Sequence, residues 1–229
     1  MKTYALIVAA GKAVRFGGAV PKQFRELCGQ PMLTWTITRF EQAASIDQIV
    51  VVVAEEHLLY ASQKVMDPFG FRKVQKIVIG GETRRESVAR GLKSLPLSTT
   101  LVAIHDGARP LVSPVDIDRV VKAAATERAA MLAIPATDAI KRVKERYILG
   151  TLDRDSIYQA QTPQVFQYDI IMEAHRAADE YIAVSDDSSL VEARGFKVRV
   201  VEPTSPNLKV TTIDDFLIAE MFLKREQHA

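Results

Sequence analysis

Short apolar runs alternate along the chain with longer stretches in which apolar residues recur at helical spacing. The apolar runs are rich in β-branched residues, and several lack the alternation of a half-exposed strand; they cover residues 4–10, 48–53, 76–79, 101–105, 130–134 and 197–201. Helical patterns lie between them, over 33–44, 55–66, 84–93, 115–126, 168–181 and 213–224. This alternation predicts an α/β fold, a Rossmann-like, mostly parallel twisted sheet with helices on both faces.

Two of the predicted helices carry clear starting signals. Ser113 stands before Pro114, which suits the first helical turn because its missing N–H would be unpaired there anyway. Thr212 precedes the last helix and is followed three residues later by Asp215, an acidic capping arrangement. We therefore expect helices to begin at these two points.

The segment 135–166 breaks the alternation, because its short mixed strands surround charged turns. It shows neither a long helical face nor a fully buried strand, and a hairpin-like arm projecting from the sheet is the natural interpretation. A free two-stranded arm is marginally stable, so a second copy of the chain is its most economical partner. We expect one domain over residues 1–229, with 136–165 as a β-arm used in dimerisation.

The N-terminal stretch YALIVAAGKAVRFGGAVPKQF is the most informative of the candidate sites. An apolar strand leads into Ala9, Ala10 and Gly11, and the following loop carries two cations, Arg15 and Lys22. Small residues let a polyphosphate approach the backbone N–H groups, and the cations neutralise its charge. The spacing fits neither a Walker loop nor a GxGxxG fingerprint. The alternative is an ordinary strand-to-loop connection with two surface cations.

Two further motifs follow predicted strands, and ligands of open α/β sheets bind at the carboxyl ends of strands. The first, GGETRRESV at 80–88, opens a helix whose backbone N–H groups can bind oxygens, although a plain helix cap would look the same. The second, HDGARP at 105–110, offers Asp106 for Mg²⁺ or a sugar hydroxyl and Arg109 for a phosphate. His105 ends an apolar strand, where a structural role is the commoner one.

Composition and charge narrow the function classes. The 30 Lys and Arg nearly balance 28 Asp and Glu, so we expect no nucleic-acid partner. Apolar runs are too short for a membrane span, and no signal-peptide pattern is seen at the N-terminus. The single cysteine, Cys28, cannot form an internal disulfide, which favours a cytoplasmic protein and suits a packed residue rather than a nucleophile.

Taken together, these motifs resemble those of the 2-C-methyl-D-erythritol 4-phosphate cytidylyltransferases. The first loop follows the family pattern AAGxGxRxxxxxPKQ, except that Ala13 replaces the second glycine. GGETRRESV and HDGARP match as well, with Glu82 and Gly107 as variations, and the resemblance extends through TPQ at 162–164 and NLKVT at 207–211. In the arm, Ala139 stands where the family often carries Thr.

The resemblance implies roles for specific residues. Arg15 and Lys22 are the expected catalytic cations. The nucleotide would contact Ala9, Ala10, Gly11, Gly80, Gly81, Glu82 and Ser87. The sugar substrate would contact Asp106, Gly107, Arg109, Arg154, Thr162 and Lys209. The resemblance also implies a homodimer in which Arg154 comes from the neighbouring subunit's arm, and Mg²⁺ held mostly by CTP phosphates with help from Asp106.

The expected reaction is transfer of a cytidylyl group from CTP to 2-C-methyl-D-erythritol 4-phosphate, releasing pyrophosphate. The acceptor's phosphate attacks the α-phosphate, and catalysis is positioning plus electrostatic stabilisation. Two alternatives stay open at this point. Ala139 leaves room for ribitol 5-phosphate as acceptor, and a CTP-binding module without turnover would share the first loop. One fold accounts for the 229 residues, so a fused second enzyme is not expected.

Overall fold

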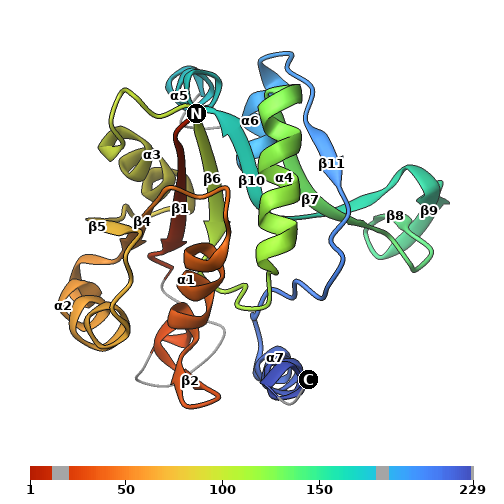
Figure 1. Cartoon of the computed structure of the whole chain (residues 1–229). Coiled ribbons are helices and arrows are strands. Elements are labelled where there is room, and N and C mark those ends of the chain that lie inside the picture. The colour runs from red at the N-terminus through yellow and green to blue at the C-terminus, as the bar shows by residue number, and fades with distance from the viewer. Residues whose placement is uncertain (12–20, 179–185, 228–229) are drawn as a thin grey trace.

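A computed structural model of the chain describes residues 1–11, 21–178 and 186–227. Its centre is a seven-stranded sheet in the order β11-β7-β10-β6-β1-β4-β5 (Figure 1). Its strands are β1 Thr3–Ala9, β4 Gln48–Val53, β5 Val74–Ile79, β6 Leu101–Asp106, β7 Ala129–Pro135, β10 Tyr158–Gln167 and β11 Arg199–Val201. Only β10 runs antiparallel to its neighbours within this sheet. The predicted mostly parallel α/β fold is confirmed.

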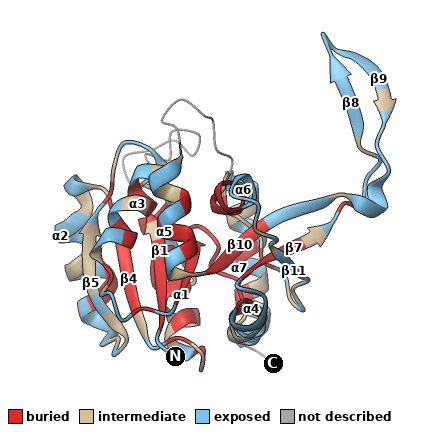
Figure 2. Ribbon diagram, turned by 90° about the horizontal axis from the view of Figure 1, so that it is seen from above, coloured by how far each residue is buried: buried red, intermediate tan, exposed pale blue. Residues whose placement is uncertain are grey.

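Helices cover both faces of the sheet, as the continuous apolar strands require (Figures 1 and 2). On one face, α1 Met32–Gln42 packs on β1 and β4, and α4 Pro114–Glu127 packs on β7, β10 and β6. On the other face lie α3 Arg84–Ser94, α5 Tyr168–Ala177 and α6 Asp187–Ala193. The last helix, α7 Ile213–Gln227, forms a smaller core with the turn between β2 Glu26–Leu27 and β3 Gln30–Pro31.

The predicted caps are present. Ser113 Oγ accepts a hydrogen bond from Asp116 N at 3.0 Å at the start of α4. Thr212 Oγ1 accepts from Asp215 N at 3.2 Å, and Asp215 Oδ2 accepts in return from Thr212 N at 2.8 Å. Both helices therefore begin where the sequence predicts.

Two predicted helices differ from those observed. The expected helix 55–66 is helical throughout, but as short consecutive segments of different helix type: η3 Glu55–His57, α2 Leu58–Tyr60 and the π-helix η4 Ala61–Met66, followed by η5 Asp67–Phe69. The helix expected over 168–181 ends at Ala177, and 179–181 lie outside the described residues.

The segment 135–166 holds two different structures. An antiparallel hairpin, β8 Lys141–Lys144 and β9 Tyr147–Thr151, stands away from the body (Figure 2). Strand β10, however, enters the sheet between β6 and β7, and its residues 161–166 are buried. The expectation that this segment lacks a buried strand is therefore wrong, and the projecting part ends before β10. The apolar pattern did not predict this strand because three of its buried residues are polar: Gln161, Thr162 and Gln164.

Within the described residues, no helix has both the length and the apolar character needed to cross a membrane.

Candidate functional site

Small residues from three strand ends meet at the carboxyl edge of the parallel strands. A Cβ on Gly80 would lie 2.5 Å from Ala10 Cβ, and one on Gly107 would lie 3.0 Å from Ala9 Cβ. Gly107 N also donates to Val8 O at 2.8 Å. A larger side chain at either glycine would push these strand ends apart, so the small residues predicted from the sequence let the ends of β1, β5 and β6 approach one another closely.

The described end of the first loop is tied back to strand β1. Gln23 is buried, and its Nε2 donates to Ala9 O at 3.0 Å and to Gly11 O at 3.4 Å. Beside it, Lys22 Nζ donates to Val210 O at 2.7 Å. Lys22 thus lies next to the NLKVT segment. Arg15, the second predicted catalytic cation, lies outside the described residues, as does Ala13.

The turn before α3 is organised by its own side chains. Thr83 caps the helix by accepting from Glu86 N at 3.1 Å. Ser87, which is buried, accepts from Gly81 N at 3.0 Å, and Glu86 Oε2 accepts from Glu82 N at 2.7 Å. Ser87 therefore shapes the predicted nucleotide turn from beneath, whereas the exposed Glu82 lies at its surface.

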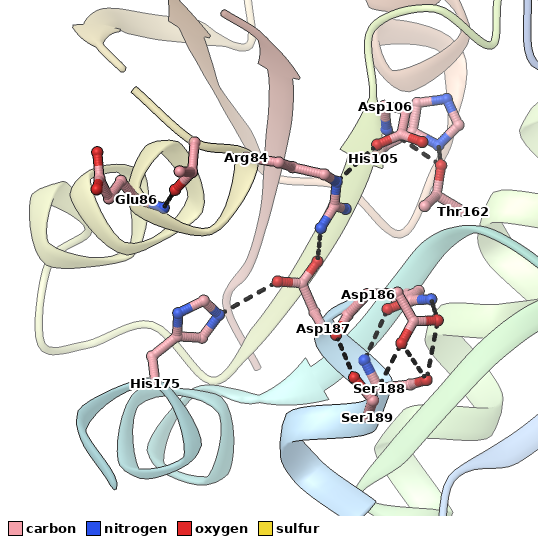
Figure 3. A network of polar contacts seen from close by, with 12 residues as sticks. Arg84, Glu86, His105, Asp106, Thr162, His175, Asp186, Asp187, Ser188 and Ser189 are labelled. Atoms are coloured by element: carbon pink, nitrogen blue, oxygen red, sulfur yellow. Dashed lines mark hydrogen bonds and ion pairs between the residues drawn. The ribbon is translucent and has the colours of Figure 1, made fainter. Parts of the chain in front are cut away.

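Asp106, at the end of β6, is the centre of a cluster of three cations. Its Oδ1 accepts from Arg84 Nε at 3.0 Å (Figure 3). Its Oδ2 lies 2.8 Å from Lys209 Nζ and 3.8 Å from Arg109 Nε. Burial alone would raise the pKa of Asp106, but Arg84 and Lys209 outweigh it and hold the pKa well below its usual range. The carboxylate is therefore ionised and holds three cations beside the glycine turns.

Arg84 is the main site residue that sequence reasoning missed. Its Nη1 also donates to Asp187 Oδ2 at 2.8 Å, so the guanidinium bridges two carboxylates. Asp187 in turn lies 3.2 Å from His175 Nε2 (Figure 3). Burial opposes the charge on both members of the Arg84–Asp187 pair, yet the pair raises the pKa of Arg84 and lowers that of Asp187. Both stay charged.

His105 and Thr162 form a directed hydrogen-bond chain under the HDGARP turn. His105 is fully buried, and this burial lowers its pKa to about 3, so the ring is neutral. Its Nε2 lies 3.2 Å from Arg109 O, which only accepts; the proton is therefore assigned to Nε2. Nδ1 then accepts from Thr162 Oγ1 at 3.0 Å, and Thr162 accepts from Asp106 N at 3.1 Å. The hydroxyl of Thr162, predicted to bind the substrate, is thus hydrogen-bonded to His105 within the fold.

The NLKVT segment docks directly on this turn. Arg109 is buried, and its Nη1 donates to Asn207 O at 2.7 Å. Asn207 Nδ2 donates to Gln161 Oε1 at 2.9 Å and to Thr162 O at 2.8 Å. These bonds bring Lys209 and Arg109 to the same carboxylate, although they lie far apart in the chain.

Arg154 lies apart from this cluster in its own chain. It begins a short turn, η6 Arg154–Ser156, after strand β9, and its side chain is exposed. Its Nη1 donates to Thr137 O at 3.1 Å. The described contact of Arg154 therefore lies at the base of the hairpin, not in the Asp106 cluster.

The described residues offer no resident metal cage. None of their His, Cys, Asp and Glu side chains gather in groups of three or more with ligand geometry. Both oxygens of Asp106 are already bound by cations. The donor set suits an anion, and the predicted Mg²⁺ would need ligands from a bound polyphosphate.

Comparison with known proteins gives a consistent result. A sequence profile of the 2-C-methyl-D-erythritol 4-phosphate cytidylyltransferases matches residues 3–225. A relative of that name from Pelotomaculum thermopropionicum is 42% identical over 228 residues, covering 99% of this chain and 96% of the relative. One from Caldanaerobacter subterraneus is 41% identical, with 98% and 100% covered.

Solved structures agree with the sequence comparison. The 4-diphosphocytidyl-2C-methyl-D-erythritol synthase of Anaerococcus prevotii superposes with a TM-score of 0.85 at 28% identity, covering 97% of this chain and 96% of that one. The 2-C-methyl-D-erythritol 4-phosphate cytidylyltransferase of Thermus thermophilus gives a TM-score of 0.78 at 32% identity, with 98% and 100% covered. The chain belongs to the 2-C-methyl-D-erythritol 4-phosphate cytidylyltransferase family.

Proposed function

We propose that the protein transfers a cytidylyl group from CTP to 2-C-methyl-D-erythritol 4-phosphate, giving 4-diphosphocytidyl-2-C-methyl-D-erythritol and pyrophosphate. One observation carries this proposal: in a member of this family, the glycine-lined strand ends meet a carboxylate that holds three cations. The first surface suits a nucleotide triphosphate, and the second suits the phosphate of an acceptor. Together they provide for both reactants of a nucleotidyl transfer.

The residues act by position and charge. Arg109 and Lys209 face the acceptor's phosphate, and Asp106 keeps both in place before it arrives. Lys22, with Arg15, stabilises the charge that builds on the α-phosphate oxygens during in-line attack. A phosphate monoester is already ionised at neutral pH, so the reaction requires no strong general base. The neutral His105 fits this scheme, because it holds the turn instead of exchanging protons.

We assign Mg²⁺ to the bound nucleotide. Phosphate oxygens would supply most of its ligands, with Asp106 as the assisting carboxylate, and the ion would neutralise charge on the triphosphate. Every other contribution comes from the cations and backbone groups of the chain itself.

We further propose a cytoplasmic homodimer built through the β8–β9 hairpin, in which Arg154 serves the partner's acceptor site. The hairpin exposes four apolar side chains that a second copy would cover: Val143, Tyr147, Ile148 and Leu149. The charged residues of β8 keep the hairpin soluble in the monomer, before a second copy covers these side chains. The acceptor site would therefore be complete only in the dimer.

The two alternatives differ from this proposal either in the identity of the acceptor or in the absence of turnover. The relatives' names favour 2-C-methyl-D-erythritol 4-phosphate over ribitol 5-phosphate. A CTP-binding module would have no need for the second cation cluster around Asp106, which argues against it.

Pyrophosphate release with CTP and each of the two sugar phosphates tests the proposal. We expect turnover with 2-C-methyl-D-erythritol 4-phosphate, and a loss on the order of 10²–10³ in rate for Arg15→Ala and for Lys22→Ala with the fold kept. Lys64→Ala, at an exposed lysine of η4, is the matched control and should keep full turnover. Near-normal rates in both loop variants would refute the catalytic assignment, and release only with ribitol 5-phosphate would change the acceptor.

A further inference from the structure

His175 is buried behind the site and has no part in the reaction described so far. It lies on α5, and its side chain is 5% exposed. Its Nε2 lies 3.2 Å from Asp187 Oδ1, and because a carboxylate only accepts, Nε2 carries the proton. Nδ1 finds no hydrogen-bond partner among the described residues. Buried polar groups are normally hydrogen-bonded, so the single bond from His175 to Asp187 is the contact that can explain its position.

That bond orients a buried carboxylate. Asp187 is the first residue of α6, and its side chain is 2% exposed. One carboxylate oxygen faces His175, and the other accepts from Arg84 Nη1 at 2.8 Å. With a donor on each oxygen, rotation of the carboxylate would break one bond or the other. Without the imidazole, Oδ1 would lose its buried donor and the carboxylate would be free to turn.

The orientation of Asp187 sets the plane of the Arg84 guanidinium. Arg84 binds Asp187 through Nη1 and Asp106 through Nε, two positions on one rigid planar group. The side chain is 30% exposed, so packing alone does not hold it. A turn of the Asp187 carboxylate would therefore shift the bond to Asp106, the residue that holds Lys209.

We propose that His175 is a positioning residue: through Asp187 and Arg84 it fixes Asp106, and thereby the cations that receive the acceptor's phosphate. Figure 3 shows this chain crossing from α5 through α6 and α3 to the end of β6. The inference deepens the proposed function and rests on it, because it assigns His175 to acceptor binding and not to the chemical step.

The kinetic test compares variants at one position with a neighbour. His175→Phe keeps a flat ring without the N–H, and His175→Gln places an amide N–H near the position of Nε2. Met172→Leu is the matched control, because Met172 is buried on the same helix and lines the same groove between α3 and α5, which has a volume of about 330 Å³. We expect His175→Phe to raise the KM for the acceptor about 10-fold with kcat within about twofold. His175→Gln should recover most of this loss.

A second measurement does not depend on turnover. The Nε–Hε resonance of Arg84 in ¹⁵N-labelled protein reports how firmly the guanidinium is held. We expect a sharp signal in the wild type, in His175→Gln and in Met172→Leu, and a broadened or shifted signal in His175→Phe. An unchanged Arg84 signal in His175→Phe overturns the proposal, as does an acceptor KM equal to that of the wild type.

The choice of variants and measurements distinguishes a folding defect from a loss of function. If His175→Phe does not fold, His175→Asn replaces it, because Asn carries the same amide as Gln but on a side chain too short to reach Asp187. Equal behaviour of the Gln and Asn variants would then overturn the proposal. If the wild type fails to use the sugar phosphate, the proposed function falls, while the Arg84 signal still decides whether His175 holds the guanidinium.

Discussion

The Asp106 cluster and the β8–β9 hairpin both carry cations expected to bind the acceptor's phosphate, yet they are built in opposite ways. Around Asp106, each cation is bonded to groups of the same chain, and Arg109 is 8% exposed. In the hairpin, every residue of β8 is exposed, and Arg154, in the η6 turn that follows β9, donates to a single carbonyl, Thr137 O, in its described contacts. The cluster is held by contacts within its own chain, whereas the described residues of the hairpin make few contacts with the body.

The difference has an energetic basis. Asp106 lies at the end of β6 in a seven-stranded sheet, and its cation partners outweigh the cost of burying its charge. The hairpin is two-stranded, and Tyr147 at its tip is 77% exposed. Such a hairpin is marginal in water by itself. In the proposed dimer, the half of the acceptor site around Asp106 would be preorganised in the monomer, and the half contributed by the hairpin would be ordered when two copies meet.

Removing the central carboxylate tests the preorganised half and should have the largest effect. In Asp106→Asn, a neutral amide cannot hold three cations together, so Arg109 and Lys209 should lose their positions. We expect turnover to fall on the order of 10²–10³. Glu192→Gln, which removes an exposed carboxylate from α6, is the control and should keep full activity. Pyrophosphate release measures both variants, and a loss below about tenfold in Asp106→Asn would contradict a preorganised cluster.

Mixing two inactive variants tests whether Arg154 completes the acceptor site of a second copy. Arg15→Ala and Arg154→Ala should each lose most activity alone. If the arm acts across the dimer, a mixed dimer contains one intact site, and an equal mixture should recover about a quarter of wild-type activity. The Arg142→Ala variant, at an exposed arginine of β8, should be active by itself. A mixture that stays inactive although mixed dimers form would show that Arg154 does not complete the partner's site.

The strands of the fold were predictable because their apolar runs report burial directly. Strand β10 was not, because its buried residues include Gln161, Thr162 and Gln164, whose hydrogen-bond partners are far away in the chain. Gln164 Nε2, for example, donates to Asp186 Oδ2 at 2.8 Å, and these residues are 22 positions apart. Polarity predicts exposure only when such partners are absent, and the sequence pattern alone does not reveal them.

Arg84 was missed for a related reason. It begins helix α3 and looks like one of several charges on an exposed face, while its partners Asp106 and Asp187 lie 22 and 103 residues away. One local signal was available: a cation in the first turn is opposed by the helix dipole, so something else must favour it there. The glycine turns and Asp106 were found more easily, because each follows a predicted strand directly.

The pH dependence of the free energy of unfolding should report on the buried side chains beneath the HDGARP turn, and on His105 in particular. Its pKa is lowered by burial to about 3, below the ordinary value of 6.5, so the unfolded chain binds a proton that the folded chain refuses between these values. The free energy of unfolding should therefore fall as pH falls from 6.5, by up to about 1.4 kcal/mol per pH unit from this residue. Asp106 and Asp187, whose pKa values are lowered, contribute stability that is lost only below about pH 4.

Urea unfolding at about pH 6.5, 5.5 and 4.5 measures this slope. His105→Gln keeps a polar side chain without a titrating ring, so it should be less stable than the wild type near neutral pH but lose less stability on acidification. Arg142→Ala, in the hairpin, should keep the wild-type slope. Equal slopes in His105→Gln and the wild type would mean that the folded chain accepts a proton at His105 as readily as the unfolded chain does. The neutral link between Thr162 and Arg109 would then not be what holds the turn beneath Asp106.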